Sequence, residues 1–259
     1  MKPSTLPLWR RPFTWVVLVL LAGCSTVPSL YNDAELAQMG IQSFQQMKEQ
    51  ATLSRNSEYN ALVSRVGERI VAQVEGEIPH AQWEFVVFED EAINAFVMPG
   101  GKVGVNTGLL KLVENEDQLA AVLGHEASHL LFDHANQRLS AATYREWGAA
   151  GLAILTDEYE VSNEAQALIL GAYGFGTEVG GLLPFSRSHE TEADLEGLKI
   201  SARAGYDPRA AVEFWRLVAG RGGDQPPALL STHPSHGNRI ERLQEAMPEA
   251  LEIYRNNRR

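Results

Sequence analysis

Residues 119–132 read Leu119-Ala120-Ala121-Val122-Leu123-Gly124-His125-Glu126-Ala127-Ser128-His129-Leu130-Leu131-Phe132, an apolar run that contains the pattern H-E-x-x-H. Such a run predicts a buried helix. On a helix, His125 and His129 leave the same face one turn apart, which suits two ligands of a tetrahedral zinc ion. Glu126 lies about 100° round the helix, where it can reach a water at the metal without being a ligand. The pattern predicts a metal-dependent hydrolase, most often a peptidase; the alternative is a helix that merely carries two histidines.

A catalytic zinc ion needs a third protein ligand and one open position. His134 follows His125 by nine residues, about 180° round a continued helix, so we expect a structural or surface histidine there. Residues 185–194 offer better candidates, because Glu190 and Asp194 are four residues apart and share one helix face. One carboxylate can bind zinc while the other accepts the free N–H of a ligand histidine. A charged surface helix would explain the same stretch.

Composition limits the partners and the kind of site. The 259 residues carry a formal net charge of −11, which argues against a nucleic-acid partner because such a partner needs a basic face. Cys24 is the single cysteine of the chain, which excludes an intramolecular disulfide and a zinc site built from thiolates.

The N-terminus has the pattern of an export signal. Basic residues up to Arg11 precede a short apolar segment at residues 13–20, and Leu21-Ala22-Gly23-Cys24 follows. The apolar segment is too short for a membrane span, which needs about 20 residues, so residues 1–23 predict a signal peptide. Its end resembles a bacterial lipobox, which implies a lipid anchor at Cys24. A plain secretory signal with an incidental cysteine is the alternative.

The rest of the chain predicts an α+β fold that is mainly α-helical, with a small three-stranded sheet beside the motif helix. The turn at residues 99–101 should join the second and third strands. Two apolar segments, 148–155 and 165–183, are either packed helices or a flank of the substrate cleft. Helices are expected at 33–50, 58–74, 116–139, 188–204, 209–219 and 238–254, and strands at 83–88, 94–98 and 102–105.

The motif and the later block Ser186-Arg187-x-x-Glu190-x-Glu192-Ala193-Asp194 resemble the HtpX and CAAX-prenyl-protease type of gluzincin metallopeptidase, and more closely its soluble bacterial lipoprotein members. Further matching stretches lie at residues 94–96, 204–211 and 232–240, so that most of residues 58–245 is covered. The resemblance implies one Zn²⁺ per chain, with His125, His129 and Glu190 as ligands. It also implies that Glu126 is the catalytic base and that Asp194 orients a ligand histidine.

The resemblance implies additional roles around this centre. It places the loop at His233 in the cleft, so that His233 and Arg239 are candidate donors to the oxyanion. In some relatives such a histidine occupies the open zinc position and keeps the enzyme latent; a loop or helix-cap residue is the alternative. The strand at Asn94, Ala95 and Phe96 would pair with an extended peptide substrate, unless it is a plain core strand.

Three regions follow from these interpretations: a lipoprotein signal peptide at 1–23, a lipidated tether and N-terminal helix at 24–57, and a zinc metallopeptidase domain at 58–259. The chain lacks the transmembrane helices and the tetratricopeptide domain of some relatives, so we do not expect CAAX processing. Ser25 favours the outer membrane, by analogy with Gram-negative lipoproteins.

The expected activity is a zinc-dependent endopeptidase of the bacterial cell envelope, anchored to the membrane at Cys24 and facing the periplasm. Its expected substrates are unfolded or misassembled envelope polypeptides, and the outer-membrane assembly machinery is a candidate partner. Two alternatives stay open. One is a chaperone or assembly factor for outer-membrane proteins with a structural zinc site, and the other is an enzyme that His233 holds latent.

Overall fold

The computed structural model describes residues 28–144, 187–221, 227–234 and 237–258. Its sheet contains β1 (Glu84–Phe88), β2 (Ala95–Met98) and β3 (Lys102–Asn106) in the order β1-β3-β2. β1 runs parallel to β3, and β2 is antiparallel to it. The turn between β2 and β3 contains Gly100 and Gly101 with φ of +81° and +76°, values that only glycine adopts readily. The three predicted strands and their turn are confirmed.

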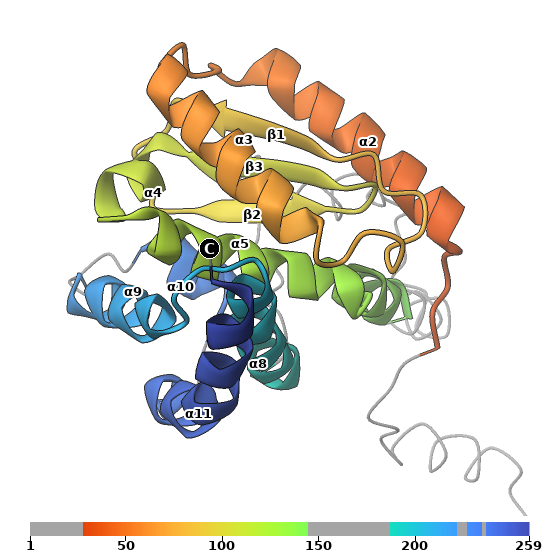
Figure 1. Ribbon diagram of the computed structural model, residues 1–259. Helices are drawn as coiled ribbons and strands as arrows, with labels where there is room; N and C mark the ends of the chain where they lie inside the picture. The colour runs from red at the N-terminus through yellow and green to blue at the C-terminus, as the bar shows by residue number, and fades with distance from the viewer. Residues whose placement is uncertain (1–27, 145–186, 222–226, 235–236, 259) are drawn as a thin grey trace, which may run out of the picture.

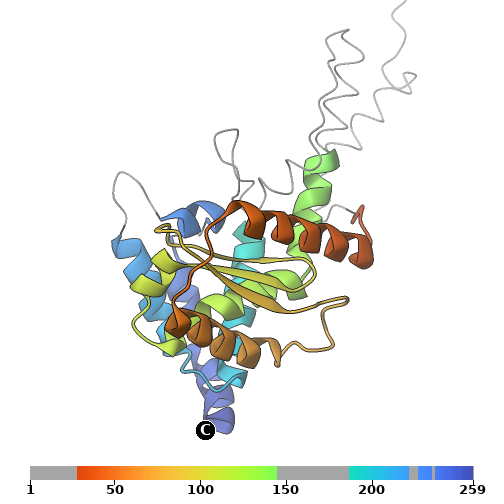
Figure 2. The same cartoon turned by 90° about the horizontal axis from the view of Figure 1, so that it is seen from above.

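Helices cover both faces of the sheet (Figures 1 and 2), with α2 (Asp33–Gln50) on one face and α3 (Ser57–Val71) on the other. Alternate residues of β2 therefore enter two different cores. Phe96 and Met98 pack with Phe44 of α2, whereas Ala95 and Val97 join the larger core beneath α3. Coverage on both faces explains why every residue of β2 and β3 is buried.

The motif helix α5 (Glu116–Leu131) runs against β2 on one side and against α8 (Arg187–Arg203) on the other. The Asn115 side chain caps its first turn by accepting from the backbone N–H of Gln118. The expectation of one helix to about Leu139 was wrong. Asp133 has a φ of +55°, which interrupts the helix, and a second helical stretch begins at residue 134. Aspartate is one of the few residues that tolerates this left-handed conformation.

Two glycines allow α5 and α8 to touch backbone to backbone. A Cβ added to Gly197 would lie 2.6 Å from the backbone nitrogen of His125, and one added to Gly124 would lie 2.7 Å from the carbonyl oxygen of Gly197. No larger residue fits at either position without moving a helix. This contact brings the carboxylates of α8 beside the histidines of α5.

The remaining helices complete a mainly α-helical domain around this pair. α4 (Thr107–Leu112) follows the sheet directly, and α11 (Arg239–Asn257) contacts both α8 and α9 (Arg209–Gly220). Pro248 lies inside α11. The C-terminal helices are α9 (Arg209–Gly220), α10 (Ala228–Thr232) and α11 (Arg239–Asn257).

Several sequence predictions fall outside the described residues, namely Cys24, the signal peptide and the apolar segments 148–155 and 165–183. Within the described ranges, no helix combines the length and the apolar character that a bilayer crossing requires.

We expect Gly197→Ala to lower the free energy of unfolding by about 1–3 kcal/mol, because the added methyl group overlaps the backbone of α5. Urea unfolding of the metal-free protein measures this change. Gly220→Ala in α9 is the matched control, since a Cβ there has no neighbour within 4 Å and should leave the stability unchanged or slightly raised. Equal stability of the Gly197 variant and the wild type would contradict the close contact.

Candidate metal centre

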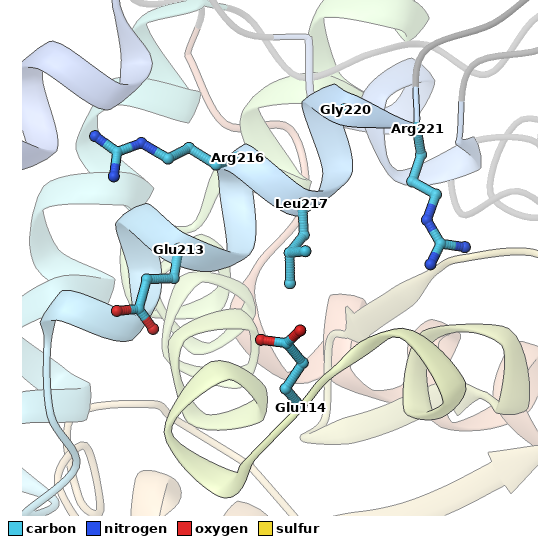
Figure 3. Close-up of a pocket in the computed structure, with 6 residues that line it drawn as sticks. All are labelled: Glu114, Glu213, Arg216, Leu217, Gly220 and Arg221. Atoms are coloured by element: carbon cyan, nitrogen blue, oxygen red, sulfur yellow. The ribbon is translucent and has the colours of Figure 1, made fainter.

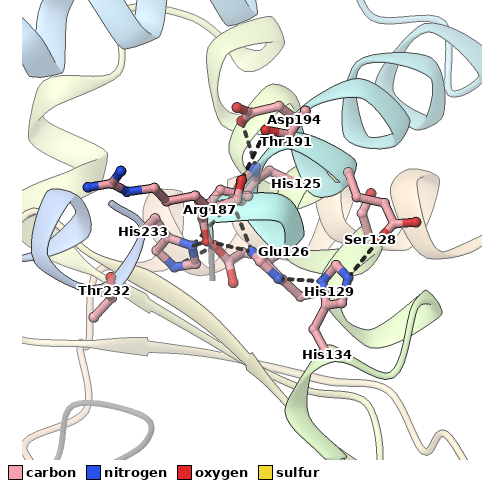
Figure 4. Close-up of polar contacts among 12 residues, drawn as sticks. His125, Glu126, Ser128, His129, His134, Arg187, Thr191, Asp194, Thr232 and His233 are labelled. Carbon is pink, nitrogen blue, oxygen red and sulfur yellow. Dashed lines mark hydrogen bonds and ion pairs between the residues drawn. The ribbon is translucent and has the colours of Figure 1, made fainter. Parts of the chain in front are cut away.

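Four buried side chains from three parts of the chain meet beside the α5–α8 contact (Figure 4). His125 and His129 come from α5, Glu190 from the first turn of α8, and His233 from the residue after α10. One potential ligand atom from each lies within 4.8 Å of all the others. The structure therefore brings together the three predicted ligands and the histidine predicted to occupy the open position.

The spacing of these atoms fits a tetrahedral zinc ion. Bonds of about 2.0–2.1 Å place neighbouring ligand atoms of such an ion about 3.3 Å apart. The Nε2 atoms of His125 and His129 are 3.1 Å apart, and each lies 3.4 Å from an oxygen of Glu190. The Nδ1 atom of His233 lies 3.2 Å from His125 Nε2 and 3.1 Å from Glu190 Oε1. Two or three imidazoles and one carboxylate are also the donor types that zinc prefers.

Charges inside the site shift the pKa values of its groups in opposite directions. Burial lowers the pKa of His125, but the carboxylates of Asp194 and Glu190 outweigh it and raise the pKa to about 10. Burial lowers the pKa of His129 well below its usual value, and positive charge on His125 lowers it further. Burial raises the pKa of Glu190, but the neighbouring His233 and His125 outweigh it and hold the pKa well below its usual range. The metal-free site thus holds a proton on one histidine and keeps the other neutral.

A second layer of side chains lies behind these ligand atoms. Asp194 Oδ1 is 3.1 Å from Nδ1 of His125, as expected for the group that orients this histidine. Arg239 is 3% exposed and donates from Nε to Asp194 (2.7 Å) and from Nη2 to Glu190 (2.6 Å). Its guanidinium group lies 3.8 Å from the ring centre of Trp215. Arg239 therefore bridges the two carboxylates instead of presenting a free guanidinium group to the cleft.

Glu126 lies next to the cluster without belonging to it. Its Oε1 atom is 3.4 Å from Nε2 of His233 and is buried without a hydrogen-bond partner among the described residues. Burial raises the pKa of its carboxyl group, and the neighbouring His233 and His125 offset only part of this rise. The geometry suits a group that takes up and releases a proton beside the metal position.

The predicted substrate strand is the edge of the sheet nearest to this site. The backbone N–H of Asn106 donates to the carbonyl of Asn94, so Ala95 and Val97 point their N–H and C=O groups away from β3. The Asn94 Oδ1 atom is buried without a hydrogen-bond partner among the described residues. Phe96 points instead into the core beneath α2, so its side chain does not face a peptide at this edge.

His134 lies outside the ligand cluster, as expected for a structural histidine, but closer to it than helical periodicity predicted. His134 is fully buried, and its Nδ1 atom lies 3.0 Å from Nδ1 of His129. The prediction placed it on the opposite face because it assumed an uninterrupted helix. The break at Asp133 instead turns the chain back, so that His134 lies behind the metal cluster. The only sign of this helix break in the sequence is Asp133, which directly follows the apolar run.

A separate hollow of about 480 Å³ lies between α9 and the loop before α5 (Figure 3). Two glutamates and two arginines balance its charge, and it shares no residue with the metal cluster. Within the described ranges, the cluster at His125 is the one group of histidines and acidic residues that could hold a metal ion. The residues that line the hollow are Glu114, Glu213, Arg216, Leu217, Gly220 and Arg221.

The fold and the site are those of a gluzincin-type metallopeptidase domain, in which the two histidines of H-E-x-x-H and a glutamate from a later helix could hold a metal ion. Comparison with known proteins agrees: residues 57–247 match peptidase family M48, whose members use zinc, and the chain belongs to this family.

Its relatives include mitochondrial and bacterial proteases. The mitochondrial metalloendopeptidase OMA1 of Schizosaccharomyces pombe is 38% identical over 190 residues, which are 73% of this chain and 53% of the relative. The corresponding OMA1 protein of Danio rerio is 34% identical over 230 residues, 86% of this chain and 48% of the relative. The beta-barrel assembly-enhancing protease of Yersinia pestis is 31% identical over 229 residues, 84% of this chain and 45% of the relative. The chain spans about half the length of these relatives.

We expect zinc binding at pH 7 to release a proton, because the pKa of His125 is raised to about 10 and the ligand must be neutral. The zinc Kd should therefore fall as the pH rises from 7 towards 10, by up to about tenfold per pH unit. Calorimetric titration in two buffers of different ionisation enthalpy measures the released proton. In the control Asp194→Asn, which removes one of the carboxylates that raise this pKa, less proton should be released. Equal heats in both buffers for the wild type would contradict a protonated His125.

Proposed function

We propose that this protein is a zinc-dependent endopeptidase of the bacterial cell envelope that cleaves unfolded or misassembled envelope polypeptides. The observation that carries the proposal is the pairing of Glu126 with the ligand set. A structural zinc site needs no base, yet here a buried carboxylate with an unpaired oxygen lies beside the metal position. Membership of a peptidase family supports the same reaction.

The proposed mechanism assigns one task to each side chain. His125, His129 and Glu190 would hold a zinc ion, which supplies a Lewis acid that activates water and polarises the scissile carbonyl. Glu126 accepts the proton of the attacking water and delivers it to the leaving amine. Arg239 donates hydrogen bonds to Glu190 and Asp194 and so keeps both carboxylates in place. Asp194 in turn orients His125. Arg239 is therefore a positioning residue in this proposal, in place of the oxyanion donor first expected.

The β2 edge is the proposed substrate site. Ala95 offers an N–H and a C=O to an extended peptide, and such main-chain pairing selects weakly for sequence. Weak selectivity suits substrates that expose their backbone, namely unfolded chains. The unpaired Oδ1 of Asn94 adds an acceptor at the start of the same edge.

His233 is proposed to hold the enzyme latent. Its Nδ1 atom takes the position of a fourth ligand, and its Nε2 atom faces Glu126. A zinc ion with four protein ligands has no open position for water. Activation then requires His233 to leave, and the short helix α10 that carries it is held to the chain before β2 by the bond from Leu229 N–H to the carbonyl of Ile93.

The proposed location is the outer membrane, with a lipid anchor at Cys24 and the domain in the periplasm. The N-terminal sequence pattern supports it, as do bacterial relatives named beta-barrel assembly-enhancing protease. The name of these relatives also favours a second candidate function, in which the protein assists the assembly of outer-membrane proteins and cleaves little. Relatives named as mitochondrial show that the family is not confined to bacterial envelopes.

We expect Glu126→Gln to reduce cleavage of unfolded casein by about 10²–10⁴-fold, because the proton acceptor is lost while the ligands stay. His233→Ala should raise cleavage above the wild-type level, because it opens the fourth position. Release of fluorescent peptides from labelled casein, with and without a chelator, measures both effects. Zinc content of each variant, measured in parallel, is the control. A zinc-loaded His233→Ala protein that cleaves nothing would contradict the endopeptidase proposal and favour the assembly role.

We expect radioactive palmitate to label the full-length protein in a Gram-negative host, and Cys24→Ala to abolish the labelling and release the protein from membranes. The physical reason is that the lipid is attached through the single thiol of the chain. Ser25→Ala, which leaves the thiol intact, is the control. Membrane fractionation that gives the same distribution for Cys24→Ala and the wild type would contradict the anchor.

A further inference from the structure

Two side chains form a hydrogen-bonded series behind the ligand His129. The Nε2 atom of His129 faces the metal cluster, so its Nδ1 atom points away from it and lies 3.0 Å from Nδ1 of His134. The Nε2 atom of His134 in turn lies 3.1 Å from Oε2 of Glu192. The series thus runs from the metal position through two imidazoles to a carboxylate that is half exposed to solvent.

The protonation pattern of this series is fixed once a metal is bound. A ligating Nε2 atom carries no proton, so the proton of His129 resides on Nδ1 and is donated to Nδ1 of His134. Neutral His134 then carries its own proton on Nε2 and donates it to the Glu192 carboxylate. Each contact has one donor and one acceptor, and the series ends on a negative charge that stabilises this direction.

The fold holds the series from both sides. The break at Asp133 starts the helical stretch that carries His134, and Glu192 lies two residues after Glu190 on α8. The ring of His189 stacks on that of His134 at a centroid distance of 4.1 Å with an angle of 13° between the planes. His189 is itself bonded to the side chain of Gln137, at 3.0 Å. The orientation of the His134 ring is therefore set by stacking as well as by its hydrogen bonds.

The two ligand histidines are thus supported in different ways. Asp194 lies directly behind His125, whereas the carboxylate for His129 is one imidazole further away. We propose that His134 and Glu192 are positioning residues for His129, which hold its Nε2 lone pair towards the metal and increase its basicity. Outer groups of this kind raise metal affinity by orienting a ligand before the metal arrives. The proposal rests on the zinc site of the proposed function.

The decisive measurement is the zinc Kd, obtained by competition with a chromophoric chelator. We expect His134→Phe to raise the Kd by roughly 10–100-fold, since it fills the space but accepts no hydrogen bond. His134→Asn should lie closer to the wild type, because its side-chain oxygen can accept from His129. A role in packing alone would reverse this order, since Phe is the better space-filler. The order of the two variants therefore separates positioning from structure.

Glu192→Gln provides a variant that does not threaten folding, because the Glu192 side chain is 53% exposed. It should raise the Kd by roughly 3–10-fold, less than His134→Phe because an amide oxygen still accepts the bond without the charge. Glu196→Gln is the matched control, since it lies on the same helix and bonds Arg203 instead of a histidine. Thermal melts of the metal-free variants show whether each one folds.

The outcomes distinguish failure of the proposed metal site from failure of the positioning role of His134 and Glu192. If the wild type binds no zinc, or if His125→Ala binds zinc with the wild-type Kd, the proposed metal site is overturned and this inference with it. If the wild type binds one zinc ion, and Glu192→Gln and His134→Phe bind it with the same Kd, the inference alone is overturned. If His134→Phe does not fold, the comparison of Glu192→Gln with Glu196→Gln decides, and equal Kd values for these two overturn the inference.

Discussion

The backbone contact between α5 and α8 is the constraint on which the site depends. Three of the candidate ligands come from two helices separated by more than fifty residues of sequence, and the atoms that bind one zinc ion must lie about 3.3 Å apart. Helices packed through ordinary side chains lie 8–10 Å apart. Glycines at 124 and 197 remove the side chains at the crossing, so that Glu190, about two turns before Gly197 on α8, can reach the histidines of α5. The same approach brings Asp194 behind His125 and Glu192 behind His134.

Charge balance then explains why the site requires a cation. Glu126, Glu190 and Asp194 are all buried, and Arg239 is the buried cation that contacts two of them. Three carboxylates and one guanidinium group leave two negative charges, which a divalent ion would neutralise. Without a metal ion, the site partly compensates by raising the pKa of His125 to about 10. Buried carboxylates without such compensation would cost several kcal/mol each.

The sequence predicted the features that local spacing controls and missed two, one that depends on a helix break and one that depends on contacts between distant residues. H-E-x-x-H predicted two ligands and the base, and the three residues lie in or beside the buried cluster. The spacing of Glu190 and Asp194 predicted that both would face the same neighbour. The strands and their glycine turn followed from alternation and from positive φ. The position of His134 did not follow, because it depends on one left-handed residue, Asp133, in a chain that otherwise continues as a helix. The bridging role of Arg239 was missed as well, because it arises from contacts across more than forty residues.

The described conformation has both reactive positions engaged by the protein itself. His233 lies where a fourth ligand would bind, and Nε2 of the same histidine lies 3.4 Å from the Glu126 carboxylate. In the proposed function, a peptide that pairs with the free edge of β2 would bring its scissile carbonyl into competition with His233 for the metal position. Both internal contacts therefore oppose substrate binding at once. Because α10, which ends just before His233, is bonded to the residue two positions before β2, an event that shifts this edge would act on both contacts together. In the proposed function, substrate recognition and the opening of the metal site would therefore be coupled.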